Sequence, residues 1–108
     1  MGSPIYTLQG SVRDQNLKPV DNKKIDLLFD NNQLCSLNTE KDGTFIFNND
    51  KVKDIYENDS VKLTSSIDGY TVSNISISRK TSQMPNGMEV RVVSAVIDVK
   101  RNKILGFL

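Results

Sequence analysis

The chain has 108 residues, the size of one ordinary domain, and its content of 37% hydrophobic and 25% charged residues is lean for a globular domain but well above a disordered composition. Its 14 basic and 13 acidic residues leave a net charge of +1, so no cationic excess is present to neutralise nucleic-acid phosphates or an anionic membrane. Histidine is absent, which excludes histidine-based general-base catalysis, Ser-His-Asp triads and the common zinc and copper sites.

The single cysteine, Cys35, excludes an intrachain disulfide. Leu34 and Leu37 lie beside it in the sequence and favour a buried, unreactive thiol. No apolar run reaches the length of a membrane span, and no signal peptide is visible. Residues 1–3 have the composition of a cloning remnant, so we expect one domain over residues 4–108 and leave open a signal or further domain upstream.

Alternating apolar and polar residues dominate the chain and predict β-strands. The first strand covers residues 6–13, and the Asn-Leu-Lys-Pro stretch at 16–19 predicts the turn that follows it. The second and third strands cover residues 24–30 and 34–39, on either side of a tight-turn signal at Asn31-Asn32.

A turn at residues 41–43, Lys-Asp-Gly, precedes a fourth strand in which Phe45 and Phe47 lie on one face. Gly43 is expected to adopt a positive φ, which a residue with a Cβ resists. One short helical turn is predicted over residues 50–57. The remaining strands and turns are predicted at residues 61–67, 68–69, 70–78, 86–87 and 88–99.

Two changes in the phase of the alternation predict β-bulges or bends, because a slip of one residue moves side chains to the other face. Val72 and Ile75 are three residues apart in the sequence. In the last predicted strand the inward apolar set changes from Met88, Val90 and Val92 to Val93, Ala95, Ile97 and Val99. About seven strands at intervals of about ten residues predict an all-β fold, a seven-to-eight-stranded antiparallel Greek-key sandwich.

A series of short motifs in the first two thirds of the chain resembles a known group of families. In order, the motifs are Gly10-x-Val12-x-Asp14, Pro19-Val20, Thr39-Glu40-x-Asp42-Gly43-x-Phe45-x-Phe47 and Asp68-Gly69-Tyr70. They resemble the carboxypeptidase regulatory-like domains, relatives of the Cna-type B domains and of transthyretin-like and immunoglobulin-like sandwiches. Residues 48–59 lack the short Leu-Pro-Pro-Gly link usual in these families, and residues 80–108 match no motif of theirs.

The resemblance implies a non-catalytic module, because such domains serve as spacers, adhesin stalks, transporter extensions and parts of secretion machines. We expect a structural or protein-interaction module of a bacterial envelope, secretion or cell-surface assembly, with a periplasmic or cell-surface location. A carbohydrate-binding or adhesin domain is an alternative, for which Tyr6 and Tyr56 are the aromatic residues that the core could spare. An accessory domain fused to an enzyme is another alternative.

No catalytic, cofactor or metal site is predicted. Calcium is disfavoured at the turn around Asp42, because the several oxygen ligands that it requires do not converge there. An isopeptide bond from Lys23 or Lys24 to Asn74 or Asp98 is weighed and disfavoured, because alternation turns Lys24 toward water. The apolar carboxyl-terminal segment is instead predicted to bind another protein, a neighbouring domain or a second copy. Its predicted contact residues are Val90, Val92, Ile97, Val99, Ile104, Leu105, Phe107 and Leu108.

Overall fold

The computed structural model describes residues 3–30, 32–60 and 62–102. Within these ranges, seven strands and one short helix form, which confirms the predicted all-β class. The helix lies where the short helical turn was predicted. The elements are β1 (Ile5–Arg13), β2 (Lys24–Phe29), β3 (Asn32–Asn38), β4 (Thr44–Asn48), α1 (Val52–Glu57), β5 (Leu63–Ile67), β6 (Tyr70–Gln83) and β7 (Glu89–Arg101).

The strands form two sheets, a large one in the order β4-β1-β7-β6 and a small one in the order β3-β2-β5. All neighbouring strands are antiparallel except β1 and β7, which pair in parallel from Ile5 with Val90 to Arg13 with Asp98. The expectation of an entirely antiparallel sandwich is therefore wrong for this pair. Two parallel neighbouring strands need a long connection between them. Here the connection consists of β2 to β6, which belong partly to the small sheet and partly to the large one.

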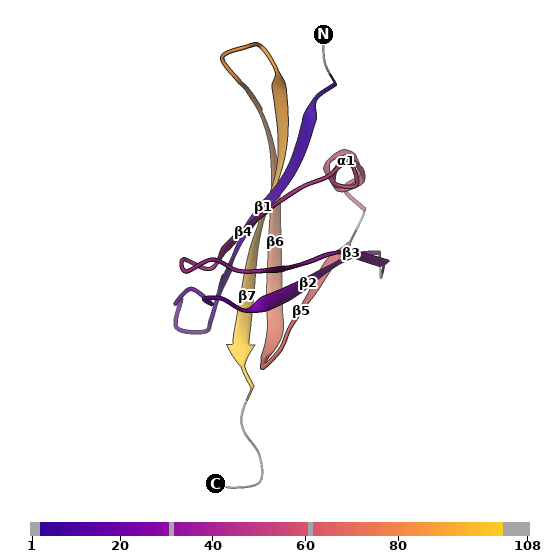
Figure 1. Ribbon diagram of the computed structural model, residues 1–108. Helices are drawn as coiled ribbons and strands as arrows, with labels where there is room; N and C mark the ends of the chain where they lie inside the picture. Colours follow the sequence, from indigo (N-terminus) through magenta and orange to yellow (C-terminus); the bar gives the residue numbers. More distant parts are fainter. Residues whose placement is uncertain (1–2, 31, 61, 103–108) are drawn as a thin grey trace, which may run out of the picture.

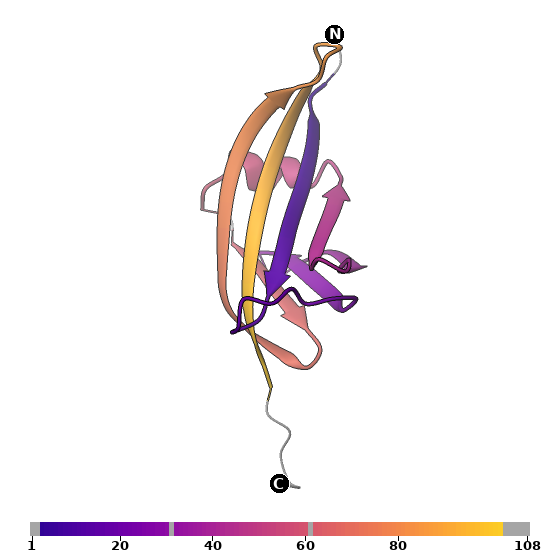
Figure 2. The same cartoon turned by 90° about the vertical axis from the view of Figure 1, so that its left-hand side faces the viewer.

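The large sheet extends well beyond the small one (Figures 1 and 2). β6 and β7 have 14 and 13 residues, whereas the strands of the small sheet have five to seven. The small sheet covers one half of the large sheet, and α1 lies against the part above it (Figure 1). We call residues 79–92, at the end of the large sheet remote from the small one, the distal hairpin.

One hydrophobic core lies between the two sheets and continues beneath α1. Burying an aliphatic side chain of this kind contributes about 1.5–3 kcal/mol. Val52 and Ile55 of α1 are fully buried, so the helix closes the core where the small sheet ends. The largest fully buried side chains are Leu8, Val12, Ile25, Leu27, Val52, Ile55, Val93, Ile97 and Val99.

Gly10 of β1 pairs with Phe45 of β4 on one side and with Ala95 of β7 on the other. A Cβ on Gly10 would lie 2.3 Å from Cζ of Phe45 and 2.8 Å from the carbonyl oxygen of Ala95. The buried Phe45 ring therefore lies directly over the glycine. The absence of a side chain at Gly10 thus admits the close approach of a neighbouring strand.

Asp14 and Gly43 shape the loops at the carboxyl-terminal end of β1. The Asp14 carboxylate accepts hydrogen bonds from the backbone N–H groups of Asn16 and Lys18, at 2.8 and 3.0 Å. Gly43 has a φ of +76°, which confirms the positive φ expected there. A Cβ on Gly43 would also lie 2.6 Å from the carbonyl oxygen of Val12, so the site excludes larger residues for two reasons.

The remaining motif residues support the loops and the border of the core. Thr39 is buried, and its hydroxyl accepts a hydrogen bond from the backbone N–H of Lys23 at 3.0 Å and donates to the carbonyl of Val20 at 2.7 Å. These bonds join the loop before β2 to the end of β3. Pro19 forms a bridge with Arg13, while Phe47 and Tyr70 are half-buried against the core.

One of the two predicted breaks in alternation is a real irregularity of the backbone. The register of β6 against β7 shifts between Val72 and Asn74, which confirms the first predicted bulge. The second prediction is wrong, because β7 pairs with β1 without a shift from Val90 to Asp98. Val90 and Val92 instead lie on the outer face of a regular strand that carries apolar residues on both faces.

We predict that Gly10→Ala lowers the free energy of unfolding by about 1–3 kcal/mol, since the Phe45 ring and the β7 backbone must move to admit the methyl group. Urea unfolding measures this loss. Ser11→Ala, one residue along β1, is the control and should change stability little. An equal effect of the two substitutions would contradict the close contact at Gly10.

Candidate functional site

The structure does not bring the predicted contact residues together on one surface. Ile97 and Val99 lie in the core with 0% and 1% of their surface exposed, so a partner cannot reach them in the folded protein. Val90 and Val92 lie on the outer face of the large sheet, in the distal hairpin. Ile104, Leu105, Phe107 and Leu108 lie outside the described residues.

An apolar strip crosses the outer face of the distal hairpin and the beginning of β1. Ile5 pairs with Val90, and paired residues of neighbouring strands share a face, so these two side chains lie side by side. Ile5 is 38% exposed and Val90 is partly exposed. Val92 is buried although it lies outside the core cluster, since it packs on the outer face. We call Ile5, Val90 and Val92 the outer strip.

On the opposite, inner face of the distal hairpin, an arginine lies between two tyrosines. The rings of Tyr6 and Tyr56 meet edge to face, with centroids 6.0 Å apart. Cζ of Arg91 lies 5.5 Å from the Tyr6 centroid and 5.8 Å from the Tyr56 centroid, within the range of cation–π attraction. Nη1 of Arg91 also donates a hydrogen bond to the Tyr6 hydroxyl at 2.7 Å.

Two carboxylates complete this group, which we call the Arg91 cluster: Tyr6, Tyr56, Glu57, Glu89 and Arg91. Glu89 accepts a hydrogen bond from Nε of Arg91, and Oε2 of Glu57 lies 3.7 Å from Nη1 of Arg91. The Glu89 bond, assisted by the bond to Tyr6, raises the pKa of Arg91 above its usual value. The cluster therefore connects α1, β1 and β7 through a permanently charged group.

A second arginine ties β6 to the same helix. Nε and Nη2 of Arg79 donate hydrogen bonds to the carbonyl oxygen of Ile55, at 3.1 and 2.9 Å. This carbonyl lies in the last turn of α1, where backbone acceptors lack partners within the helix and a cation is favourable. Tyr56 also forms a hydrogen bond with Thr81. Both strands of the distal hairpin are therefore fastened to α1.

The expectation that Tyr6 and Tyr56 are spare aromatic residues is wrong. Tyr6 is 7% exposed, and Tyr56 is half-buried against the core. The packing of these two tyrosines was missed because nothing in the sequence indicated that α1 covers the beginning of β1. The alternation of Ile75 and Ile77 with Ser76 and Ser78, continued by one step, is the signal that could have placed Arg79 on the inner face.

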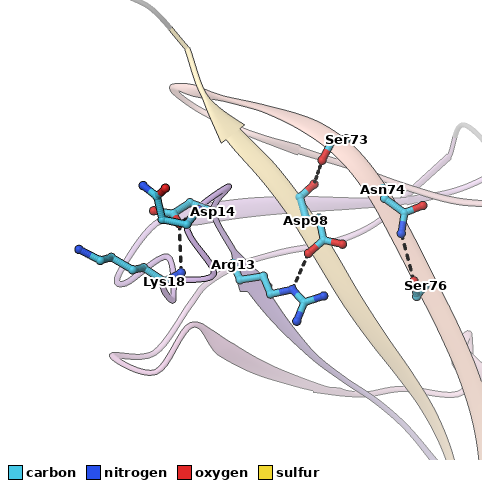
Figure 3. Close-up of polar contacts among 8 residues, drawn as sticks. Arg13, Asp14, Lys18, Ser73, Asn74, Ser76 and Asp98 are labelled. Carbon is cyan, nitrogen blue, oxygen red and sulfur yellow. Dashed lines mark hydrogen bonds and ion pairs between the residues drawn. The ribbon is translucent and has the colours of Figure 1, made fainter.

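On the other half of the outer face, polar contacts gather where β1 and β7 end (Figure 3), while Ile46 and Val96 remain apolar members of this face. Arg13 forms an ion pair with Asp98, and the hydrogen bond from Arg13 lowers the pKa of Asp98. The Ser73 hydroxyl donates to the Asp98 carbonyl at 3.0 Å. Lys23 and Lys24 are exposed and lie at the small sheet, so the structure does not bring either lysine to Asp98 for an isopeptide bond.

The Asp42 carboxylate is engaged within its own turn. It accepts hydrogen bonds from the backbone N–H and the hydroxyl of Thr44, and these bonds lower the pKa of Asp42. Within the described ranges, no three or more acidic or cysteine side chains gather as they would around a metal ion. In the same part of the chain, no helix has the length and apolar character needed to cross a membrane.

We predict that Arg91→Met loosens α1 from the distal hairpin, because it removes the charge while keeping an apolar stem. Hydrogen–deuterium exchange should become faster in α1 and in the first residues of β1, and stay unchanged in β2. Arg13→Met is the matched control, since it breaks an ion pair on the outer face that does not contact α1. Unchanged protection of α1 in Arg91→Met would contradict the role of the cluster.

Cys35 provides a second test. Its side chain is only partly buried against the core, less than the sequence led us to expect. This partial burial, aided by the charge of Asp26, raises the pKa of its thiol from 9.0 to about 11. At pH 8 the native thiol should react with a disulfide reagent roughly 50- to 100-fold more slowly than the urea-unfolded thiol, because only the thiolate reacts. The folded state binds this proton more tightly than the unfolded state does. The contribution of Cys35 to the free energy of unfolding should therefore be lost as pH rises from 9.0 toward 11. Equal rates in the two states would contradict the burial.

Comparisons with known proteins leave the family unassigned: no protein-family model matches the sequence, and no curated protein gives a significant match. The resemblance carried by the Gly10 and Gly43 motifs therefore remains an expectation.

Proposed function

We propose that this protein is a non-enzymatic structural or protein-interaction module of a bacterial envelope, secretion or cell-surface assembly. The proposed architecture is a Greek-key sandwich of the carboxypeptidase regulatory-like and transthyretin-like group. The motif series from Gly10 to Tyr70 supports this family and its setting. The projecting distal hairpin supports the interaction role.

The observation that carries this role is the combination of a fastened inner face and an apolar outer face. Arg79 and Arg91 hold the distal hairpin against α1, so the strands keep their shape beyond the small sheet. The opposite face presents Ile5 and Val90 to solvent. A preorganised surface loses little conformational entropy on binding, which favours recognition by a partner protein.

The outer strip is the proposed contact surface on the described part of the chain. Ile104, Leu105, Phe107 and Leu108 form a second proposed contact region. Val92 pairs with Thr7 in the same register and is buried, so it contributes packing more than exposed area. Apolar residues at the centre of an interface commonly account for most of its binding energy.

We predict that a photo-crosslinker at Val90 captures one discrete partner in extracts of the source organism. A crosslinker at Ser36, an exposed residue of β3, should capture none. Val90→Glu should then weaken that complex at least tenfold, or about 1.4 kcal/mol, because a carboxylate would be desolvated at the contact. Mass spectrometry identifies the captured protein, and titration calorimetry with it measures the affinity.

Deletion of residues 103–108 tests the second region separately. Capture that is equal at Val90 and Ser36, together with unchanged affinity in Val90→Glu and in the deletion variant, would contradict the proposed function. Loss of affinity in the deletion alone would restrict the contact to the tail and remove the outer strip from the proposal.

A further inference from the structure

Each open sheet leaves two edge strands, and their lengths differ greatly. The edges are β4 and β6 in the large sheet and β3 and β5 in the small sheet. β6 has 14 residues, while β3, β4 and β5 have seven, five and five. A long edge strand presents a row of backbone N–H and C=O groups that can pair with another strand. Within the described ranges, β6 is thus the longest free edge.

Most of this edge lacks the features by which proteins protect exposed strands. The bulge between Val72 and Asn74 protects only its beginning. From Asn74 to Gln83 the register against β7 is unbroken, and the sequence of this segment contains no proline. Arg79 points to the inner face and binds α1, so Lys80 is the one charged residue on the outer face of this segment.

We propose that this edge pairs with the β6 strand of a second copy of the chain, antiparallel and about a two-fold axis at Ser78. In antiparallel pairing about a two-fold axis perpendicular to the sheet, opposed residues lie on the same face and so differ by an even number of positions. The axis therefore passes beside a residue, which faces its own copy, and not between two residues. Residues 74–82 of each copy then pair, which uses nearly all of the bulge-free edge.

The positions of the two cations select Ser78 as the centre. An axis at Arg79 or Lys80 would place two like charges directly opposite each other, which destabilises a strand pair. With the axis at Ser78, Lys80 faces Ser76 of the second copy and Arg79 faces Ile77. An axis at Ile77 also avoids the like charges but pairs a shorter segment.

The resulting contacts avoid like-charge pairs on both faces. On the outer face the opposed pairs are Asn74 with Ser82, Ser76 with Lys80, and Ser78 with Ser78, all able to form hydrogen bonds. On the inner face, Ile75 faces Thr81 and Ile77 faces Arg79. Ile75 and Ile77 are half-buried at the border of the core, and the second copy would cover their remaining surface.

This inference goes beyond the proposed function, since the edge of β6 and the outer strip are different surfaces. The experiment uses the full chain with Cys35→Ala, so that each variant carries one cysteine. Ser78→Cys should form a disulfide-linked dimer on mild oxidation, because the two Cα atoms would lie about 4.5–5.5 Å apart. Ser82→Cys is the matched control and should form no disulfide-linked dimer, since the two substituted residues would lie roughly 26 Å apart in the paired strands.

Three further variants test the register and its independence. A mixture of Asn74→Cys and Ser82→Cys chains should crosslink, because the register opposes these two positions. Ser78→Lys should raise the dimer dissociation constant at least tenfold in analytical ultracentrifugation, whereas Ser82→Lys should change it little. Val90→Glu should leave the dimer intact, which separates this pairing from binding at the outer strip.

A protein that remains monomeric at millimolar concentration would overturn the proposal, as would a dimer that crosslinks equally through Ser78→Cys and Ser82→Cys. Circular dichroism of each variant shows whether the sandwich is folded. If Ser78→Lys fails to fold, the crosslinking of Ser78→Cys and of the mixed pair still decides the question.

Discussion

β1 pairs in parallel with β7 along its whole length, and this register places the functional features of the molecule. It sets Ile5 beside Val90, which makes the outer strip, and Tyr6 beside Arg91, which centres the cluster under α1. It also sets Arg13 beside Asp98, and these two form an ion pair. A shift of one residue would turn the core side of β1 to solvent and separate all three pairs.

The same pairing brings the first and the last strand of the fold side by side. Arg13 and Asp98 are 85 positions apart, so the central pair of the large sheet forms only after nearly the whole domain has been made. Closing so long a loop costs entropy before any contact offsets it, and such non-local folds form slowly. The edge of β6 is complete only when β7 has joined it, so assembly with a second copy would follow folding of the single chain.

Local features could be predicted from the sequence because each depends on neighbouring residues. Period-two alternation gave the strands, Gly43 gave a turn with a positive φ, and the spacing of Val72 and Ile75 gave the bulge. Long-range features could not be predicted in this way. Nothing near Tyr6 in the sequence shows that α1 covers it.

The break predicted within β7 shows a further limit of sequence patterns. A strand with apolar residues on both faces has the same pattern as a strand that slips by one residue, and Val90 to Val93 fit either description. The two cases differ only in whether the outer face carries apolar residues, which depends on distant strands. For the same reason Ile97 and Val99 appeared available to a partner, although both are core residues of the central strand.

The direction of β1 and β7 also determines how the protein would respond to mechanical force. β1 begins at Ile5 and β7 ends at Arg101, at opposite ends of two parallel neighbours. A pull applied through these two points slides one strand past the other and loads all of their backbone hydrogen bonds at once. Bonds loaded in shear break together, whereas an antiparallel hairpin pulled at its open end separates one bond at a time. The parallel register of β1 and β7 would thus make this pair resist a force applied between Ile5 and Arg101.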